Sequence, residues 1–436
     1  MGMDRQSLDT ITIVGAGPSG LLLAHYLLAR GYAVEVYDRR PDPRLMSPDT
    51  RRSFPVVLHE RGRRALQAIP GLEAAIAMHG NLCSGSVLHS KKGFRDVPRA
   101  QTSIVVGRNQ LVAILLEQLD ARYESSRPGS PLKIQFDCQC QSLNCEQQTI
   151  AFRRSSGETF SVTYERLIGA DGVGSQIRTE LVNRYGLKSQ KEEIPDAYRS
   201  MFCRRVNVEQ GVELAADRIH TANRGMDCRI LMGAQPGDHL YGVLIFDANH
   251  DPLVGMDSPG DVLEFVGEHF PTFRALMDDD DAEDLLGRPV VRLMSVSCDR
   301  FHQGDRVLLI GDAAHAVSPS IGQGCNSALE DAAILNRLLD QYGDDWSQVM
   351  PMFSQIRVPD AHALQELSNY SFPRTKGLMV ELLLRLTLGR RLHKWFPSLV
   401  LPFVSDLLMD SSRSYTEVLQ LSQGWIDKVK RSTATP

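Results

Sequence analysis

The sequence predicts an α/β protein. A mostly parallel sheet is built from three separated segments of chain, an antiparallel sheet is inserted between the second and third segments, and helices form the C-terminal region. Three glycine-containing turns, at residues 15–20, 169–172 and 311–324, support this prediction because each follows a short apolar strand. Between the last two turns, residues 200–246 change to strands separated by turn signals, which indicates the inserted sheet.

The first turn has the context of a dinucleotide-binding fingerprint. Residues 11–14 read as a strand, residues 21–30 read as a helix, and Gly31 is expected to end that helix. Glycines let a pyrophosphate approach the backbone, and free N–H groups at a helix N-terminus favour an anion. We therefore predict a Rossmann-like unit with a dinucleotide at this turn, and a βαβ unit without a ligand is the alternative. The expected contacts are Gly15, Gly17, Ser19 and Gly20.

An acidic residue supports the same reading. Asp38 follows the second predicted strand, residues 33–37, about 20 residues beyond the glycines, as the fingerprint requires. A carboxylate there accepts the hydroxyl protons of an adenosine ribose and repels a 2′-phosphate. FAD or NAD is therefore expected at this turn in preference to NADP.

Composition limits the class of protein. A length of 436 residues suggests two or three domains, and the net charge of -5 gives no basic footprint for nucleic acid. Eight cysteines without a signal peptide predict reduced thiols and a cytoplasmic location. Cys138 and Cys140 alternate with Ile134 and Phe136, so we expect them on the buried face of one strand, and no metal site is predicted.

The remaining elements follow from periodicity. A helix is expected from about residue 326, with Glu330 and Asp331 in its first turns, where acidic groups favour the start of a helix. Further predictions are a helix at 109–122, a hairpin-like pair at 133–143 and 149–153, and apolar strands at 161–168 and 306–310.

These elements divide the chain into three expected parts. The FAD-binding domain is assigned to 8–72, 101–190 and 288–365, the substrate domain to 73–100 and 191–287, and a C-terminal helical cap to 366–436.

The three turns, taken in order, resemble the single-component FAD-dependent aromatic hydroxylases of the para-hydroxybenzoate hydroxylase fold. The similarity is greatest to the kynurenine 3-monooxygenase family and extends to about residue 415, including residues 60–63, 311–330 and 353–362. It implies an enzyme that uses NAD(P)H to reduce FAD and inserts one atom of O2 into an electron-rich small aromatic substrate. No side chain is assigned as the catalytic group, because the cofactor carries the chemistry.

The resemblance also implies cofactor contacts. Asp312 would accept hydrogen bonds from the flavin's ribityl hydroxyls, with a helix N-cap as the alternative. N–H groups of the turn at Gly322 would face the N1–C2=O edge of the flavin, where negative charge builds on reduction. Arg108 matches an arginine near the FAD, with a surface salt bridge as its alternative. The other implied contacts are Arg39, Arg52, Asp171, Gly172, Gln323, Gly324, Cys325 and Asn326.

The substrate pocket departs from the kynurenine hydroxylases. Ser86 stands where that family has an arginine that grips the substrate carboxylate, and Pro98 and Arg99 stand where it has a tyrosine. A serine supplies neither the charge nor the fork of a guanidinium, so we expect a different substrate and poor turnover of L-kynurenine. Arg99 is either a relocated anion contact or, as we prefer, a surface residue. The predicted pocket comprises Ser86, Pro319, Ser320, Asn326 and Tyr370, of which Tyr370 is equally a core aromatic.

Two other functions stay open: an FAD-dependent reductase and a non-enzymatic, membrane-associated flavoprotein. Residues 378–408 are apolar but are interrupted by basic residues and prolines, so no transmembrane segment is expected. We expect them to cap the active site, and a basic amphipathic surface that docks on anionic lipid is the alternative. The sequence leaves open the substrate's identity, the choice of NADH or NADPH, and the oligomeric state.

Overall fold

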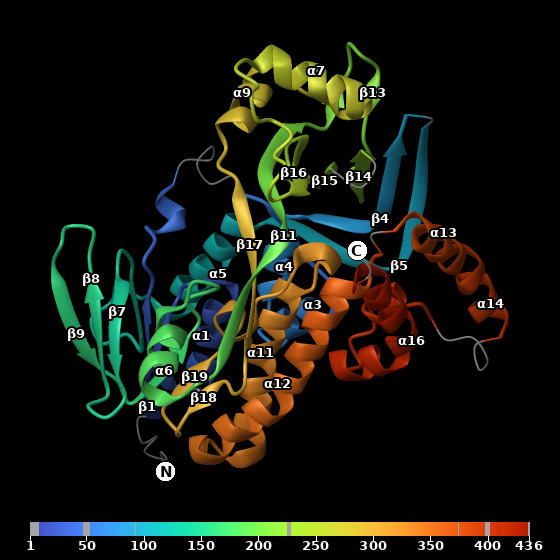
Figure 1. Cartoon of the computed structure of the whole chain (residues 1–436). Helices are drawn as coiled ribbons and strands as arrows, with labels where there is room; N and C mark the ends of the chain where they lie inside the picture. The colour runs from blue at the N-terminus through green and yellow to red at the C-terminus, as the bar shows by residue number, and fades with distance from the viewer. Residues whose placement is uncertain are drawn as a thin grey trace.

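Two large sheets organise the molecule, one below and one above in Figure 1. The computed structural model describes residues 8–46, 53–91, 93–224, 228–373, 375–396 and 402–434.

The lower sheet has six strands in the order β18-β19-β10-β1-β2-β6, and all its pairings are parallel except β18 with β19. In its register Val14 pairs with Gly169, and Gly169 pairs with Leu309. The three glycine turns therefore begin side by side at one edge of the sheet, where open α/β sheets bind ligands. The bounds are β1 (Leu8–Val14), β2 (Tyr32–Tyr37), β6 (Leu132–Gln135), β10 (Arg166–Gly169), β18 (His302–Gln303) and β19 (Val307–Leu309).

The upper sheet has eight strands in the order β17-β11-β16-β15-β14-β4-β5-β3. An antiparallel inserted sheet was predicted, and the sheet differs from this prediction in one pairing: β14 and β4 are parallel. Edge strands β3 and β17 lie in this sheet, although both fall within the segments assigned to the FAD-binding domain. The bounds are β3 (Pro55–Leu58), β4 (Asn81–Ser90), β5 (Gly93–Gly107), β11 (Ser189–Arg204), β14 (Arg218–Arg224), β15 (Cys228–Gln235), β16 (His239–Asp247) and β17 (Val291–Cys298).

Two predicted strands are each divided between sheets. Asp137 adopts a left-handed φ of 57°, and there the chain leaves β6 for β7, so Cys138 lies between two strands and not on one. Likewise, the strand predicted at 161–168 is split between β9 and β10. The small sheets comprise β7 (Gln139–Asn144), β8 (Thr149–Arg153) and β9 (Thr159–Thr163), and β12 (Val206–Asn207) with β13 (Val212–Glu213).

Helix α1 (Pro18–Arg30) follows the first turn and ends at Gly31, whose φ is 97°, as predicted. Helix α11 (Gly324–Tyr342) follows the third turn and packs against α1. The other helices before the C-terminal region are η1 (Pro43–Leu45), α3 (Glu60–Gln67), α4 (Leu72–Ala77), α5 (Arg108–Tyr123), α6 (Gln176–Tyr185), α7 (Pro259–His269), α8 (Pro271–Arg274), α9 (Asp279–Gly287), α10 (Asp312–His315) and η2 (Pro319–Ile321).

The C-terminal region is helical, as predicted, and lies at the right of Figure 1. Helix α12 crosses the expected domain boundary and packs against α16. Their buried contact includes Leu364, Leu367, Val418 and Ile426. Among the described residues, no helix combines the length and apolarity needed to cross a membrane. The bounds are α12 (Trp346–Tyr370), α13 (Lys376–Leu384), a π-helical turn (Arg385–Gly389), α14 (Arg390–Trp395), α15 (Val404–Leu407) and α16 (Tyr415–Ala434).

Candidate functional site

Two glycines of the first turn are required by packing. Gly15 has a φ of 112°, and a Cβ on it would lie 2.2 Å from the Ala170 carbonyl oxygen. A Cβ on Gly20 would lie 2.2 Å from the Gly15 carbonyl oxygen. The close packing of β1, α1 and the second turn is therefore possible only because Gly15 and Gly20 have no Cβ.

Gly17 differs from its neighbours because its open side faces no backbone. A Cβ there would meet only Arg108 Nη2, at 4.0 Å. The turn itself is held by Asp38, whose Oδ2 accepts a hydrogen bond from Ala16 N at 2.7 Å. An open glycine at a helix N-terminus, with a guanidinium beside it, fits a pyrophosphate.

The first and third turns are in direct contact. Gly311 has a φ of 57°, and a Cβ on it would lie 2.8 Å from Ser19 Oγ. Ser19 is buried. Ser19 therefore packs between the first and third turns. The lack of a Cβ on Gly311 allows the chain beside Asp312 to lie close to the N-terminus of α1.

Arg108 lies between the two ends of the predicted cofactor path. Burial lowers the pKa of Arg40, and the charge of Arg108 lowers it further. Burial raises the pKa of Asp312, and Arg108 opposes that rise. The pKa of Cys325 is raised to about 12 by burial and by Asp312, and Arg108 again lowers it. The guanidinium of Arg108 is thus close to groups of both the first and the third turn. A cation in that position suits the pyrophosphate, which joins the two halves of a dinucleotide.

Asp312 is accessible to solvent, although the surrounding protein desolvates its carboxylate. A carboxylate that a ligand can reach, and that is otherwise surrounded by protein, is suited to accepting hydrogen bonds from hydroxyl groups.

Asp171 offers a second acceptor. Its Oδ2 accepts a hydrogen bond from Gln176 N at 2.7 Å, whereas its buried Oδ1 has no partner in the described part of the chain. The space beside Gly172 is open. These features leave polar groups for a ligand to satisfy.

At the third turn, two side chains serve the protein itself. Asn326 donates to the carbonyls of Val57 and Gly322, both at 2.9 Å, and its Oδ1 accepts from His59 N at 2.8 Å. Gln323 is also fully buried. Their backbone N–H groups stand at the start of α11 with those of Gly324 and Cys325, and a helix N-terminus favours negative charge.

His59 was not predicted from the sequence. It is buried, and its Nδ1 lies 2.8 Å from Ser103 Oγ. Its Nε2 lies 3.5 Å from the position of a Cβ on Gly322. Burial, with a further contribution from Arg99, lowers the pKa of His59 to about 3, so the ring is neutral at ordinary pH. His59 precedes the charged helix α3, and a lone histidine in that position gave no sign in the sequence that it would be buried beside the third turn.

A buried ion network behind the third turn was also missed. Arg357 donates to Asp331 at 2.8 Å, Asp360 at 2.8 Å and Glu330 at 3.1 Å. Asp331 in turn accepts from Gly311 N at 2.7 Å. Glu330 and Asp331 were expected to favour the start of the helix, but both pair with Arg357 of α12, and they also pair with Arg61 of α3 and His315 of α10, respectively.

The predicted pocket residues are divided between two places. Ser86 lies on β4 and accepts from Arg99 Nη2 at 3.3 Å. Ser320 donates to the Ser368 carbonyl on α12, and Tyr370 packs in the C-terminal core with Lys430 Nζ 5.2 Å from its ring centre. Pro319 is exposed at the start of η2.

One predicted arginine receives no support from contacts, and a second lies outside the described part of the chain. Arg39 and Arg40 are both exposed, and it is the pKa of Arg40 that the charge of Arg108 lowers. Arg52 lies outside the described residues.

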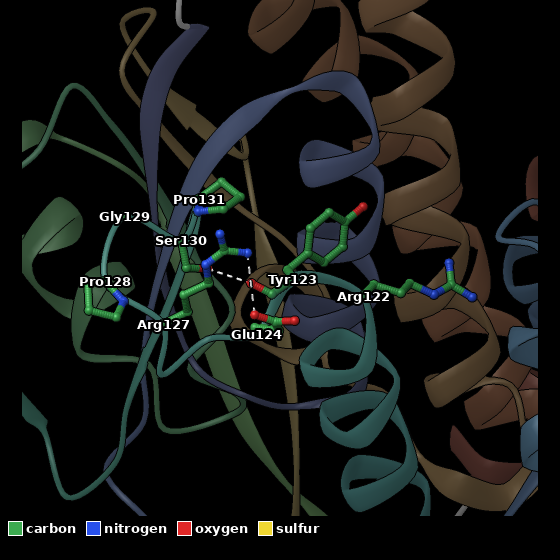
Figure 2. A pocket seen from close by; sticks show the side chains of 8 residues that line it. All are labelled: Arg122, Tyr123, Glu124, Arg127, Pro128, Gly129, Ser130 and Pro131. Atoms are coloured by element: carbon green, nitrogen blue, oxygen red, sulfur yellow. Dashed lines mark hydrogen bonds and ion pairs between the residues drawn. The ribbon is translucent and has the colours of Figure 1, made fainter.

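A cavity of about 350 Å³ lies away from this site, between the end of α5 and the start of β6 (Figure 2). Arg127 and Glu124 form an ion pair at its wall, 3.5 Å apart. Because α5 has 16 residues, this cavity is about 24 Å along the helix from Arg108. It therefore takes no part in the cofactor site.

Comparison with known proteins agrees with this geometry. A family model described as an FAD-binding domain matches residues 8–252 and 257–348. The kynurenine 3-monooxygenase of Legionella pneumophila is 32% identical over 370 residues, covering 82% of this chain and 78% of that protein. The one of Anopheles gambiae is 30% identical and covers 98% and 87%. The chain belongs to the kynurenine 3-monooxygenase family.

Solved structures share the fold of this monooxygenase. Tetrameric 2-methyl-3-hydroxypyridine-5-carboxylic acid oxygenase superposes with a TM-score of 0.69 at 20% identity, covering 93% of this chain and 98% of that one. PqsL of P. aeruginosa, in complex with 2-aminobenzoylacetate, gives 0.62 at 20% identity, covering 83% and 95%. The protein is an FAD-dependent monooxygenase that uses NAD(P)H and O2, and the reductase and non-enzymatic alternatives are not favoured.

Proposed function

We propose that this monooxygenase hydroxylates an electron-rich aromatic compound that carries an acidic group, and that Arg99 binds this group. The main support for this proposal is a hydrogen bond of 3.3 Å from Arg99 Nη2 to Ser86 Oγ. Ser86 is the position at which the family's carboxylate-binding arginine was expected. The guanidinium therefore reaches the same region from the neighbouring strand.

A bulge in β5 explains how Arg99 reaches this region. Cys83 pairs with Ser103, and Gly85 pairs with Pro98, so residues 99–102 of β5 stand opposite one residue of β4. Extra residues in one strand disrupt the ladder and re-aim side chains, often beside active sites. Arg99 begins this bulge.

Electrostatics indicate that Arg99 points inward. Its charge contributes to the lowered pKa of His59, after burial, and it opposes the rise that burial causes in the pKa of the Cys83 thiol. His59 adjoins Gly322, so Arg99 and the third turn lie on the same side of the structure. Arg99 is half-buried, which supports a binding role over the surface role that we preferred from the sequence.

The chain's own groups would hold the cofactor as follows. The N-terminus of α1, the open face of Gly17 and Arg108 would bind the pyrophosphate, Asp38 the ribose and Asp312 the ribityl hydroxyls. When bound, FAD supplies electron transfer and oxygen activation. N–H groups at the start of α11 would stabilise negative charge on the flavin edge.

The substrate class can be tested with a panel scored by acceleration of flavin reduction. It contains L-kynurenine and anthranilate-like and quinolone-like aromatics, each acid beside its methyl ester. Arg99→Met should weaken the acids about tenfold to over a hundredfold and leave the esters unchanged, because a charge-assisted hydrogen bond is lost. Arg95→Met, at an exposed arginine of the same strand, is the matched control.

Two results would contradict the proposal. One is that Arg99→Met binds every acid as the wild type does. The other is that esters accelerate flavin reduction as well as their acids. L-kynurenine stays a predicted poor substrate because Ser86 and Pro98 stand where the family has its arginine and tyrosine, and the panel tests whether Arg99 alone replaces that pair.

A further inference from the structure

The C-terminal segment is hydrogen-bonded to Gln323, the residue immediately before α11. Tyr415 and Gln323 are both fully buried. Tyr415 Oη donates to Gln323 Oε1 at 3.1 Å, and Gln323 Nε2 makes a longer contact of 3.4 Å with the Leu408 carbonyl. Both polar atoms of the Gln323 side chain therefore bond to residues of the C-terminal segment, Leu408 and Tyr415.

Neighbouring contacts hold the same segment in place. Arg61 of α3 donates to the Arg413 carbonyl at 2.6 Å, and its guanidinium lies 4.2 Å from the centre of the Tyr415 ring. Arg61 also pairs with Glu330 of α11 at 2.5 Å. Thr416 N donates to Asp360 of α12 at 2.9 Å. The backbone on both sides of Tyr415 is thus held, Arg61 lies over its ring, and its hydroxyl donates to Gln323.

The position of Gln323 gives this contact its significance. Gln323 is the N-cap of α11 and follows Gly322, whose φ of 66° makes the turn. Glycines on both sides leave the turn little side-chain packing of its own. Its placement then depends on the buried amide of Gln323 and on the amide of Asn326, which donates to the Gly322 carbonyl.

We infer that Tyr415 is a positioning residue: through Gln323, it fixes the turn whose N–H groups face the flavin. This inference rests on the proposed placement of the flavin at residues 322–326. With the hydroxyl removed, the Gln323 amide oxygen is buried without a donor, and the turn relaxes away from the place where N–H groups best stabilise the reduced flavin. The C-terminal region would therefore tune the cofactor through this one hydrogen bond.

The test uses Tyr415→Phe in the full-length holoenzyme. This variant keeps the ring under Arg61 and removes only the hydroxyl. Tyr26→Phe is the matched control, because it removes a buried phenol hydrogen bond of 2.6 Å to the Ala65 carbonyl, and this bond involves neither residues 322–326 nor the C-terminal segment. The measurements are the flavin reduction potential, peroxide released per NAD(P)H consumed, amide exchange at residues 322–326, and thermal stability.

In Tyr415→Phe we expect a lower flavin potential, about two- to tenfold more peroxide and faster amide exchange at the turn, as for the loss of one hydrogen bond. Tyr26→Phe should match the wild type in all three. If Tyr415→Phe does not fold, Gln323→Met removes the same contact from the other side and should give the same shifts.

The inference is overturned if Tyr415→Phe loses thermal stability as Tyr26→Phe does but keeps the potential, the peroxide yield and the exchange rates of the wild type. A wild type that purifies without flavin would instead contradict the proposed cofactor site. Amide exchange at the turn would still decide whether Tyr415 positions it.

Discussion

Replacing Gly17 with alanine should separate cofactor binding from folding. Gly17 has φ −83° and ψ 176°, which alanine adopts without strain, and the new Cβ would meet only Arg108 Nη2 at 4.0 Å. Alanine is a poorer N-cap than glycine but lowers the entropy of the unfolded chain, and because these two effects oppose each other the free energy of unfolding of the cofactor-free protein should change by less than about 1 kcal/mol. The methyl group would occupy the face to which we assign the pyrophosphate. Loss of one charge-assisted hydrogen bond, about 1.5 to 3 kcal/mol, weakens FAD binding about tenfold to over a hundredfold.

The assay pairs urea denaturation of the cofactor-free protein with titration of FAD. Gly20→Ala is the contrasting variant, because its Cβ would lie 2.2 Å from the Gly15 carbonyl oxygen and 3.2 Å from Ala170 Cβ. It should lower the free energy of unfolding even without FAD. Wild-type affinity for FAD in Gly17→Ala would refute the assignment of this face to the pyrophosphate. Equal destabilisation by both variants would refute the distinction between them.

Two further substitutions test the third turn and the network behind it. Asp312→Ala should lose FAD and keep the fold, because it removes a reachable acceptor and no core volume; equal FAD occupancy in both proteins would remove Asp312 from the site. Arg357→Met should lower the free energy of unfolding by about 3–5 kcal/mol in urea denaturation, because buried carboxylates lose their partner. Burial alone would raise the pKa of Asp331, but His315 and Arg357 hold it below its ordinary value. Its contribution is therefore present above the unfolded-state pKa and lost as pH falls through the folded one, so the cost of Arg357→Met should shrink in acid; a constant cost would contradict this.

The glycine turns illustrate what local sequence could predict. A strand, a glycine turn and a helix are contiguous in sequence, and the backbone freedom they need is a property of single residues. Gly15, Gly20 and Gly31 were therefore found with their elements, and α1 was found with its end. The FAD-binding family and the monooxygenase class followed from the order of three such turns.

Strand partners were harder to assign, because an apolar run does not show which sheet it joins. The strand predicted at 161–168 contains parts of two sheets, and the one at 133–143 is broken at Asp137. The parallel pairing of β14 with β4 joins residues about 130 positions apart. Such pairings are decided by packing between distant segments, which periodicity within one strand does not encode.

The sequence by itself determined the βαβ unit, the turns and the class of cofactor, because these depend on the conformations open to neighbouring residues. Only the tertiary structure decided the partners of the polar side chains. Asp331 meets Arg357, Gln323 meets Tyr415, and Arg99 reaches Ser86 across a bulge. Each of these pairs joins residues that are far apart in the sequence. The hydrogen bond or ion pair stabilises the protein only after the intervening chain has folded and brought the two residues together.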